Sequence, residues 1–152
     1  MAHKTVLFLC TGNYYRSRFA EYLFNTLAGR QELAWRAESR GLSTAFGRWK
    51  VGPMSHHAVD ALRTRDIRLP AFVREPLLCC DADLVRSDLV IALKEEEHRP
   101  LVQKCFPDHC GRVEFWHVHD IDKAHPEQAL GELDGLVRGL VGRLGTEGGA
   151  RA

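Results

Sequence analysis

The sequence predicts one α/β domain in which helices cover both faces of a parallel sheet. Short apolar runs alternate with segments of helical periodicity along the chain, which is typical of such a sheet. Residues 88–93 are almost wholly apolar, as strands buried on both faces are. The 152 residues are enough for one sizeable core. We therefore expect a single domain over residues 1–145 and a flexible tail over residues 146–152.

The first half of the chain is expected to form two strands and two helices. The apolar run Thr5–Cys10 predicts a first strand, and an apolar stripe at helical spacing predicts a helix over Ser17–Ala28. Ala34–Ser39 predicts a second strand, and a loop of small and polar residues follows it. A second helix is expected to start at Pro53 or Met54.

The second half is expected to complete the sheet and to cover it. A short helix is predicted near Glu75–Cys79, within an otherwise irregular stretch. Strands are predicted at Asp88–Leu93 and Arg112–Val118, with a helix over Glu95–Cys105 between them. The spacing of Leu and Val from Pro126 to Leu144 predicts an amphipathic closing helix, although its glycines weaken its regularity.

The composition is that of an ordinary globular protein. Hydrophobic residues make up 45% of the chain and the formal net charge is +1, so no nucleic-acid or membrane partner is expected. The N-terminal apolar run is one strand long, far short of the roughly 20 residues that a membrane helix needs, and it lacks the pattern of a secretory signal. The five cysteines are an odd number, which favours free thiols and a cytoplasmic location.

The most informative stretch joins the first strand to the first helix. Five residues separate Cys10 from Arg16, which is enough for a loop that curls around one tetrahedral anion. Gly12 is expected to supply the unusual backbone angle of this curl, and Asn13 tolerates a left-handed conformation. Arg16 offers a planar fork to two phosphate oxygens, and its charge favours the thiolate form of Cys10. The expected phosphate-binding residues are Thr11, Gly12, Asn13, Tyr14, Tyr15, Arg16 and Ser17.

A carboxylic acid is expected to face this loop. Cys10 closes the first strand, and Asp120 and Asp122 follow the fourth, so all three should lie at the carboxyl end of the sheet. Either carboxylate could serve as general acid beside a nucleophilic Cys10. Tyr14, Trp49 and Asp122 are candidates for the mouth of the site, where an aromatic pair would suit a ring-bearing phosphate ester.

These motifs resemble the low-molecular-weight protein-tyrosine phosphatase family over nearly the whole chain. The family's Cys-x5-Arg-Ser is matched by Cys10–Ser17, its Ala-Glu by Ala20-Glu21, and its late Trp-x-Val-x-Asp by Trp116–Asp120. The resemblance implies a flavodoxin-like three-layer fold with a four-stranded parallel sheet. It also implies a phosphomonoester hydrolase that works through a phosphocysteine. Its catalytic residues would be Cys10, Arg16 and Asp120, the last preferred over Asp122 because of the Trp-x-Val-x-Asp match.

Several positions depart from the family pattern. Tyr15 stands where the family usually has a second cysteine, so a disulfide protecting Cys10 from over-oxidation is not available in that form. Arg18 replaces a proline and is expected to add positive charge near the mouth. The family's hydrogen-bonding histidine is missing just before Arg74, and no aromatic wall follows Asp120.

The substrate implied by the resemblance is a phosphorylated protein or a small phosphate ester, and no metal or cofactor is expected. The bulk of Tyr14 argues mildly against the arginine-phosphatase branch, where the matching residue is a small Thr. Three alternatives stay open: a phosphate-binding protein without turnover, an arsenate reductase, and a phosphocysteine carrier. His117 and His119 beside Asp120 could also bind a metal ion, although a third ligand is not identifiable. The sequence does not indicate an oligomeric state.

Overall fold

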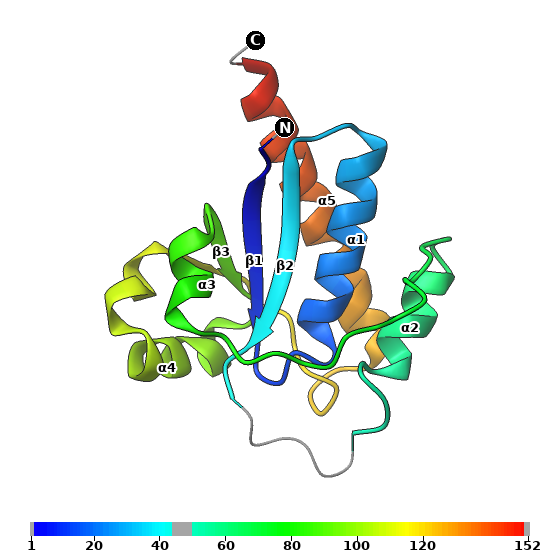
Figure 1. The fold of residues 1–152 in the computed structure, drawn as a ribbon. Helices are drawn as coiled ribbons and strands as arrows, with labels where there is room; N and C mark the ends of the chain where they lie inside the picture. Colours follow the sequence, from blue (N-terminus) through cyan, green and yellow to red (C-terminus); the bar gives the residue numbers. More distant parts are fainter. Residues whose placement is uncertain (1, 44–49, 151–152) are drawn as a thin grey trace.

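A four-stranded parallel sheet forms the centre of the computed structural model, which describes residues 2–43 and 50–150 (Figure 1). The strand order is β2-β1-β3-β4, and all three pairings are parallel. The strands are β1 at Lys4–Cys10, β2 at Trp35–Gly41, β3 at Leu89–Ala92 and β4 at Val113–Phe115. The predicted fold class, a three-layer α/β fold with a four-stranded parallel sheet, is confirmed.

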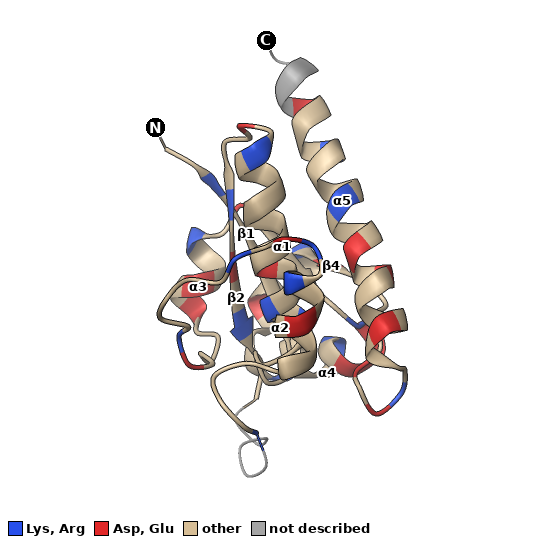
Figure 2. Cartoon of the chain, turned by 90° about the vertical axis from the view of Figure 1, so that its right-hand side faces the viewer, with Lys and Arg blue, Asp and Glu red and all other residues tan. Residues whose placement is uncertain are grey.

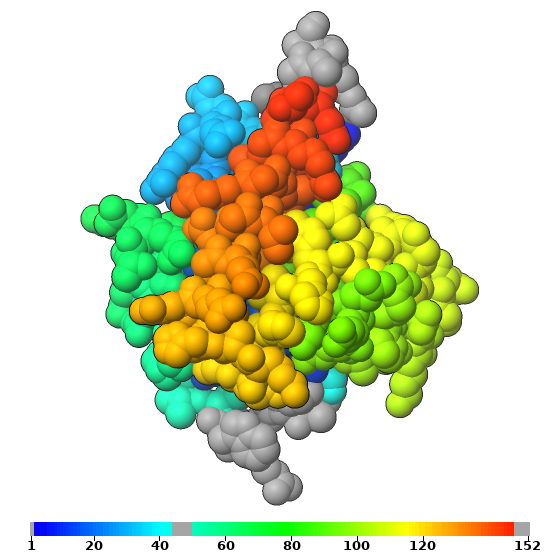
Figure 3. All heavy atoms as spheres, turned by 180° about the vertical axis from the view of Figure 1, so that it is seen from behind, coloured from blue at the N-terminus to red at the C-terminus, as the bar shows by residue number. Residues whose placement is uncertain are grey.

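Helices cover both faces of the sheet. On one face lie α1 at Arg16–Arg30, α2 at His56–Arg63 and α5 at Pro126–Ala150. On the other lie α3 at Asp81–Arg86 and α4 at Glu95–Cys105, with the short 3₁₀-helix η1 at Pro107–Arg112. Seen from behind, α5 crosses the molecule between α2 and the residues that lead into β4 (Figure 3).

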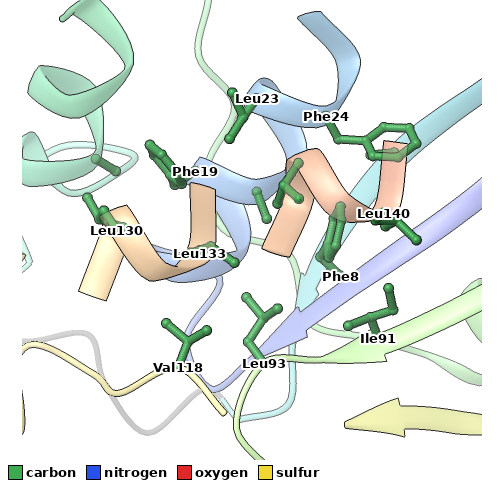
Figure 4. Close-up of a cluster of buried hydrophobic side chains, with 14 of the residues drawn as sticks. Phe8, Phe19, Leu23, Phe24, Ile91, Leu93, Val118, Leu130, Leu133 and Leu140 are labelled. Carbon is green, nitrogen blue, oxygen red and sulfur yellow. The ribbon is translucent and has the colours of Figure 1, made fainter. Parts of the chain in front are cut away.

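The alternation of side chains along β1 divides the core into two clusters. Val6, Phe8 and Cys10 face α1 and α5, whereas Leu7 and Leu9 face α3 and α4. Figure 4 shows the first cluster, in which side chains of β1, β3, α1 and α5 converge. Because β1 is buried on both faces from Val6 onward, the position of Cys10 at its end is held by the core.

The ends of the helices differ from the predicted ones where hydrogen bonds decide them. The second helix begins at His56, two or three residues later than predicted, because Ser55 is its N-cap: the Ser55 Oγ accepts from the His57 N–H at 3.2 Å. The closing helix α5 continues past Leu144 to Ala150. Flexibility of residues 146–152 stays a prediction.

The short helix predicted near residues 75–79 is wrong. That segment is extended, and Leu78 forms a parallel bridge with Gly41 at the end of β2. Hydrogen bonds to Gly41 and to the Asn13 side chain hold the segment in this conformation, and the helix α3 starts only at Asp81. The fourth strand is also shorter than predicted, because beyond Phe115 the chain makes only an isolated antiparallel bridge between His117 and Lys94.

Charged residues of both signs are interspersed over the chain (Figure 2). This distribution agrees with the net charge of +1. In the part of the chain that the structure describes, no helix combines the length and the apolar character needed to cross a membrane.

Candidate active site

The loop from Cys10 to Ser17, which we call the anion loop, lies at the carboxyl end of β1 and leads into α1. Its left-handed backbone angle lies at Asn13, where φ is 51°. The sequence predicted this angle at Gly12 instead. The Asn13 side chain stabilises this conformation, because its Oδ1 accepts from the Leu77 backbone N–H at 3.0 Å and its Nδ2 donates to Ser17 and Ser39 at 2.9 Å each. Hydrogen bonds of the Asn13 side chain thus stabilise a backbone conformation that glycine adopts more readily than other residues.

The Cys10 thiol has a hydrogen-bond donor beside it. Cys10 is buried, and its Sγ lies 2.9 Å from the Ser17 Oγ. Since the Ser17 Oγ already accepts from Asn13, its own hydrogen can point to the sulfur. The Ser17 hydroxyl therefore offers the sulfur a hydrogen bond.

The backbone N–H groups of the anion loop are a second feature of the site. From Gly12 to Ser17, none of these groups is hydrogen-bonded to any of the described residues. A cavity of about 240 Å³ is lined by residues of this loop, among them Cys10 and Arg16, and by Asp120. Unpaired N–H groups at a helix start, together with a guanidinium, form a site for a tetrahedral anion.

Arg16 is buried, and its guanidinium is held from three sides. Its Nη1 donates to the Val118 carbonyl at 3.0 Å, and its Nη2 lies 2.7 Å from Glu97 Oε2 and 3.5 Å from Asp120 Oδ2. Burial works against the charge, but Cys10 and the two carboxylates outweigh it and raise the pKa of Arg16. The guanidinium is therefore a fixed positive charge at the base of the cavity.

Glu97 and His98 belong to the site, although sequence reasoning missed them. The His98 Nδ1 accepts from the Lys94 backbone N–H at 3.0 Å, so the ring proton lies on Nε2, 3.0 Å from Thr11 Oγ1 and 3.2 Å from Glu97. Burial lowers the pKa of His98, which favours the neutral ring. Their position just after the third strand, at the same end of the sheet as Cys10, is the signal that could have found them.

The structure separates the two candidate acids. Asp120 lines the cavity, and its Oδ1 accepts from the Ile121 N–H at 2.9 Å while Oδ2 faces Arg16. Asp122 is exposed and does not line the cavity. Of the other expected mouth residues, Tyr14 lines the cavity, whereas Trp49 lies outside the described residues.

Tyr14 is tied down, and a lysine that was not predicted stands beside it. The Tyr14 hydroxyl donates to the Val51 carbonyl at 2.6 Å, which fixes the ring against residues 50–52. The Lys50 ammonium lies 5.0 Å from the centre of the Tyr14 ring and also lines the cavity. Burial lowers the pKa of Lys50, and the charges of Cys10 and Asp120 oppose that shift.

Arg18 is not at the mouth, contrary to prediction. It is fully buried, and its guanidinium donates to the backbone carbonyls of Asn13 at 3.3 Å, Pro53 at 3.0 Å and Arg74 at 2.8 Å. These bonds tie the anion loop to two segments that are distant in the sequence. Arginine has enough donors to satisfy all three carbonyls, which explains why it is tolerated in the core.

Arg74 supplies a hydrogen bond that sequence reasoning did not foresee. Its Nη1 donates to Asn13 Oδ1 at 2.9 Å, and its Nη2 lies 3.1 Å from Glu21 Oε1. The Glu21 carboxylate in turn accepts from the Ser39 hydroxyl at 2.5 Å. A network of charged and polar groups behind the loop therefore fixes Asn13, and through it Ser17 and Cys10.

The second cysteine of the family pattern is replaced by a buried phenol. Tyr15 packs in the core cluster, and its hydroxyl has no hydrogen-bond partner among the described residues. Burial, and after it the charge of Asp120, raises the pKa of Tyr15 to about 12. Within residues 2–43 and 50–150, no group of three His, Cys, Asp or Glu side chains could hold a metal ion.

This parallel sheet, with an anion loop between its first strand and first helix, has the form of a low-molecular-weight phosphatase. Residues 5–130 match the family "Low molecular weight phosphotyrosine protein phosphatase", and the chain belongs to that family. It is 34% identical over 102 residues, 66% of this chain, to the protein-arginine-phosphatase of Bacillus subtilis. It is 29% identical over 104 residues, again 66% of this chain, to the low molecular weight phosphotyrosine protein phosphatase of Mus musculus.

The matched parts span 62% and 61% of these two relatives. Among solved structures, the low molecular weight protein tyrosine phosphatase from T. tengcongensis superposes with a TM-score of 0.76 at 28% sequence identity. That comparison covers 92% of this chain and 99% of the other. The fold is therefore common to both chains over almost their whole length.

Proposed function

We propose that the protein is a phosphatase that hydrolyses phosphorylated proteins through a phosphocysteine on Cys10. The single observation that carries the proposal is the cavity of about 240 Å³ in which Cys10, Arg16 and Asp120 meet. The loop residues from Gly12 to Arg16 that line this cavity have backbone N–H groups with no acceptor among the described residues. A nucleophile, a cation for the phosphate oxygens and an acid thus line one cavity.

The reaction proceeds in two steps. The Cys10 thiolate attacks phosphorus in line with the leaving oxygen, and the P–O bond to that oxygen breaks while a P–S bond forms. Arg16 and the loop N–H groups stabilise the charge on the three equatorial oxygens. Asp120 gives a proton to the leaving oxygen and then removes a proton from the water that cleaves the P–S bond. Phosphate leaves, and Cys10 returns to the thiolate.

A phosphorylated protein as substrate is supported by the relatives. One is named a protein-arginine-phosphatase and the other a phosphotyrosine protein phosphatase. We favour phosphotyrosine for this chain, because the Tyr14 ring and the exposed side chain of Ile121 line the cavity. These apolar groups suit an aromatic leaving group better than a charged guanidinium.

Hydrolysis of p-nitrophenyl phosphate at mildly acidic pH tests the proposal. We expect wild type to release phosphate and Cys10→Ser to be inactive, because serine is a far weaker nucleophile than a thiolate. Asp120→Asn should lower kcat by about 10²–10⁴-fold, the usual effect of losing a general acid.

Asp122→Asn is the matched control, since that carboxylate lies outside the cavity, and it should keep wild-type activity. Wild type no faster than Cys10→Ser would reject the proposal. Binding of phosphotyrosine peptides without such turnover would assign the protein to the class that recognises phosphate only.

A further inference from the structure

A second cavity opens beside the anion loop. It has a volume of about 300 Å³ and shares Gly12, Tyr14 and Lys50 with the cavity that holds Cys10. Its other side is formed by Leu77 and Leu78, which are 42% and 54% exposed. The two cavities are therefore adjacent, and Leu77 and Leu78 give the second one an apolar side next to the phosphate site.

The segment that carries these leucines is the outermost extended chain of the sheet at this point. The Gly41 N–H donates to the Leu77 carbonyl, and the Cys79 N–H donates to the Gly41 carbonyl, both at 2.8 Å. Figure 1 shows this green segment crossing the carboxyl end of β2. In such a parallel pairing the N–H and C=O of Leu78 itself point away from Gly41.

The backbone of Leu78 is consequently an open sheet edge. Within residues 2–43 and 50–150, neither its N–H nor its C=O has a hydrogen-bond partner. An extended peptide can pair with exactly such groups, although most protein edges are protected against it. The open edge is short, which limits pairing to one or two residues and suits a transient substrate.

The edge is anchored directly to the anion loop. The Leu77 N–H donates to Asn13 Oδ1 at 3.0 Å, and a Cβ at Gly41 would lie 2.9 Å from the Thr11 carbonyl. Residues of an extended peptide follow each other at about 3.3 Å. In a peptide whose backbone pairs with Leu78, a phosphorylated residue only a few positions along the peptide therefore reaches the anion loop.

We propose that Leu78 and the cavity beside it bind the chain of a phosphoprotein substrate in extended conformation, next to its phosphorylated residue. The peptide backbone pairs with the N–H and C=O of Leu78, and an apolar side chain of the peptide fills the cavity against Leu77. This inference rests on the proposed function and names its substrate class: an extended segment with an apolar residue near the phosphate, in preference to a small phosphate ester.

Substrates that differ only in the docking part test the inference. The probes are p-nitrophenyl phosphate, a phosphotyrosine peptide with Val at its flanking positions, and the same peptide N-methylated at one flanking amide at a time. We expect methylation at one position to lower kcat/KM roughly ten-fold, as the loss of a hydrogen bond does, and methylation elsewhere to have little effect.

A protein variant gives a second measurement. Leu78→Asp should lower kcat/KM for the Val-flanked peptide roughly ten-fold, since it places a charge against an apolar side chain, and should leave p-nitrophenyl phosphate within about two-fold. Val85→Asp on α3, where Val85 is 66% exposed, is the matched control and should change neither.

The inference is overturned if no methylated position matters, or if Leu78→Asp affects both substrates equally. Its failure is distinct from failure of the proposed function, because p-nitrophenyl phosphate reports on Cys10 alone. If wild type hydrolyses nothing, the same peptides are titrated against the protein directly. Weaker binding by Leu78→Asp and by one methylated peptide then supports the docking edge, and unchanged binding rejects it.

Discussion

The ionised carboxylate of Glu97 contributes to the stability of the fold. Its carboxylate lies 2.7 Å from Arg16 Nη2 and 3.2 Å from His98 Nε2. Burial raises the pKa of Glu97, but the hydrogen bond to His98 and the charge of Arg16 outweigh it and lower the pKa from 4.5 to about 2. A carboxyl group whose pKa is lower in the folded state than in the unfolded state stabilises the fold at pH values above its unfolded pKa. That stabilisation is lost as the pH falls toward the pKa of the folded state.

We therefore expect Glu97→Gln to lower the free energy of unfolding by about 1–2 kcal/mol at pH 7, less than full linkage gives because the side chain is partly exposed. The difference from wild type should shrink as the pH falls from 4.5 toward 2. Urea unfolding at several pH values measures it. Glu96→Gln is the control, because Glu96 is an exposed neighbour. A difference that does not depend on pH would contradict the account.

A substitution at Tyr15 is expected to raise the free energy of unfolding. Its buried hydroxyl has no partner among the described residues, so replacing it should relieve an unsatisfied polar group. Tyr15→Phe should raise the free energy of unfolding by about 1 kcal/mol. Tyr22→Phe on α1, where the side chain is only partly buried, is the control and should change it by less than about 0.5 kcal/mol. Destabilisation of Tyr15→Phe in urea would mean that the hydroxyl is hydrogen-bonded after all.

At the scale of elements, the backbone of β2 lies close to the anion loop at Gly41. A Cβ at Gly41 would lie 2.9 Å from the Thr11 carbonyl oxygen and 3.1 Å from the Asn13 nitrogen. At these distances it would clash with the backbone of the loop. Gly41→Ala should therefore displace the loop, lowering stability by about 1–3 kcal/mol and phosphatase activity with it.

Glycines of α5 should respond in the other direction. A Cβ at Gly139 meets nothing within 4 Å, so Gly139→Ala should raise the free energy of unfolding by up to about 1 kcal/mol through helix propensity. Thermal unfolding and p-nitrophenyl phosphate assays of the two variants check both statements together. Equal behaviour of Gly41→Ala and Gly139→Ala would show that the close approach at Gly41 is not real.

Local pattern predicted the elements well where burial decides them. The strands β1 and β3 and the helices α1 and α4 were expected within a few residues, because continuous apolar runs and stripes mark them. The extended segment at 75–79 was missed because its hydrogen bonds go to Gly41 and Asn13, which are distant in the sequence. Local propensity carries no information about such partners.

Within the site too, local features could be predicted from the sequence, and contacts between distant segments could not. The spacing of Cys10 and Arg16 predicted a tight loop between the first strand and the first helix, and a loop lies there because a single local turn determines it. The roles of Glu97 and Arg74 depend on how α4 and the 74–79 segment pack against that loop. Arg18 was expected to add positive charge near the mouth, but three backbone carbonyls hold it in the core.

At the scale of the whole molecule, the end of the closing helix α5 is tested by a deletion. Leu144 is the last buried apolar side chain in the described part of the chain. Removing residues 146–152 should therefore change the free energy of unfolding by less than about 0.5 kcal/mol. Chemical denaturation of the shortened chain measures this, and a loss of more than about 1 kcal/mol would show that the end of α5 contributes to the fold.

The whole account depends on a covalent bond between Cys10 and phosphorus. Rapid acid quenching of the enzyme during turnover of p-nitrophenyl phosphate, followed by mass spectrometry of the peptide that contains Cys10, detects it directly. We predict the added mass of one phosphoryl group on that peptide in wild type, in greater amount in Asp120→Asn with a good leaving group, because the water attack then lacks its base. Turnover with an unmodified Cys10 peptide, or with the phosphoryl group on another residue, would contradict the account.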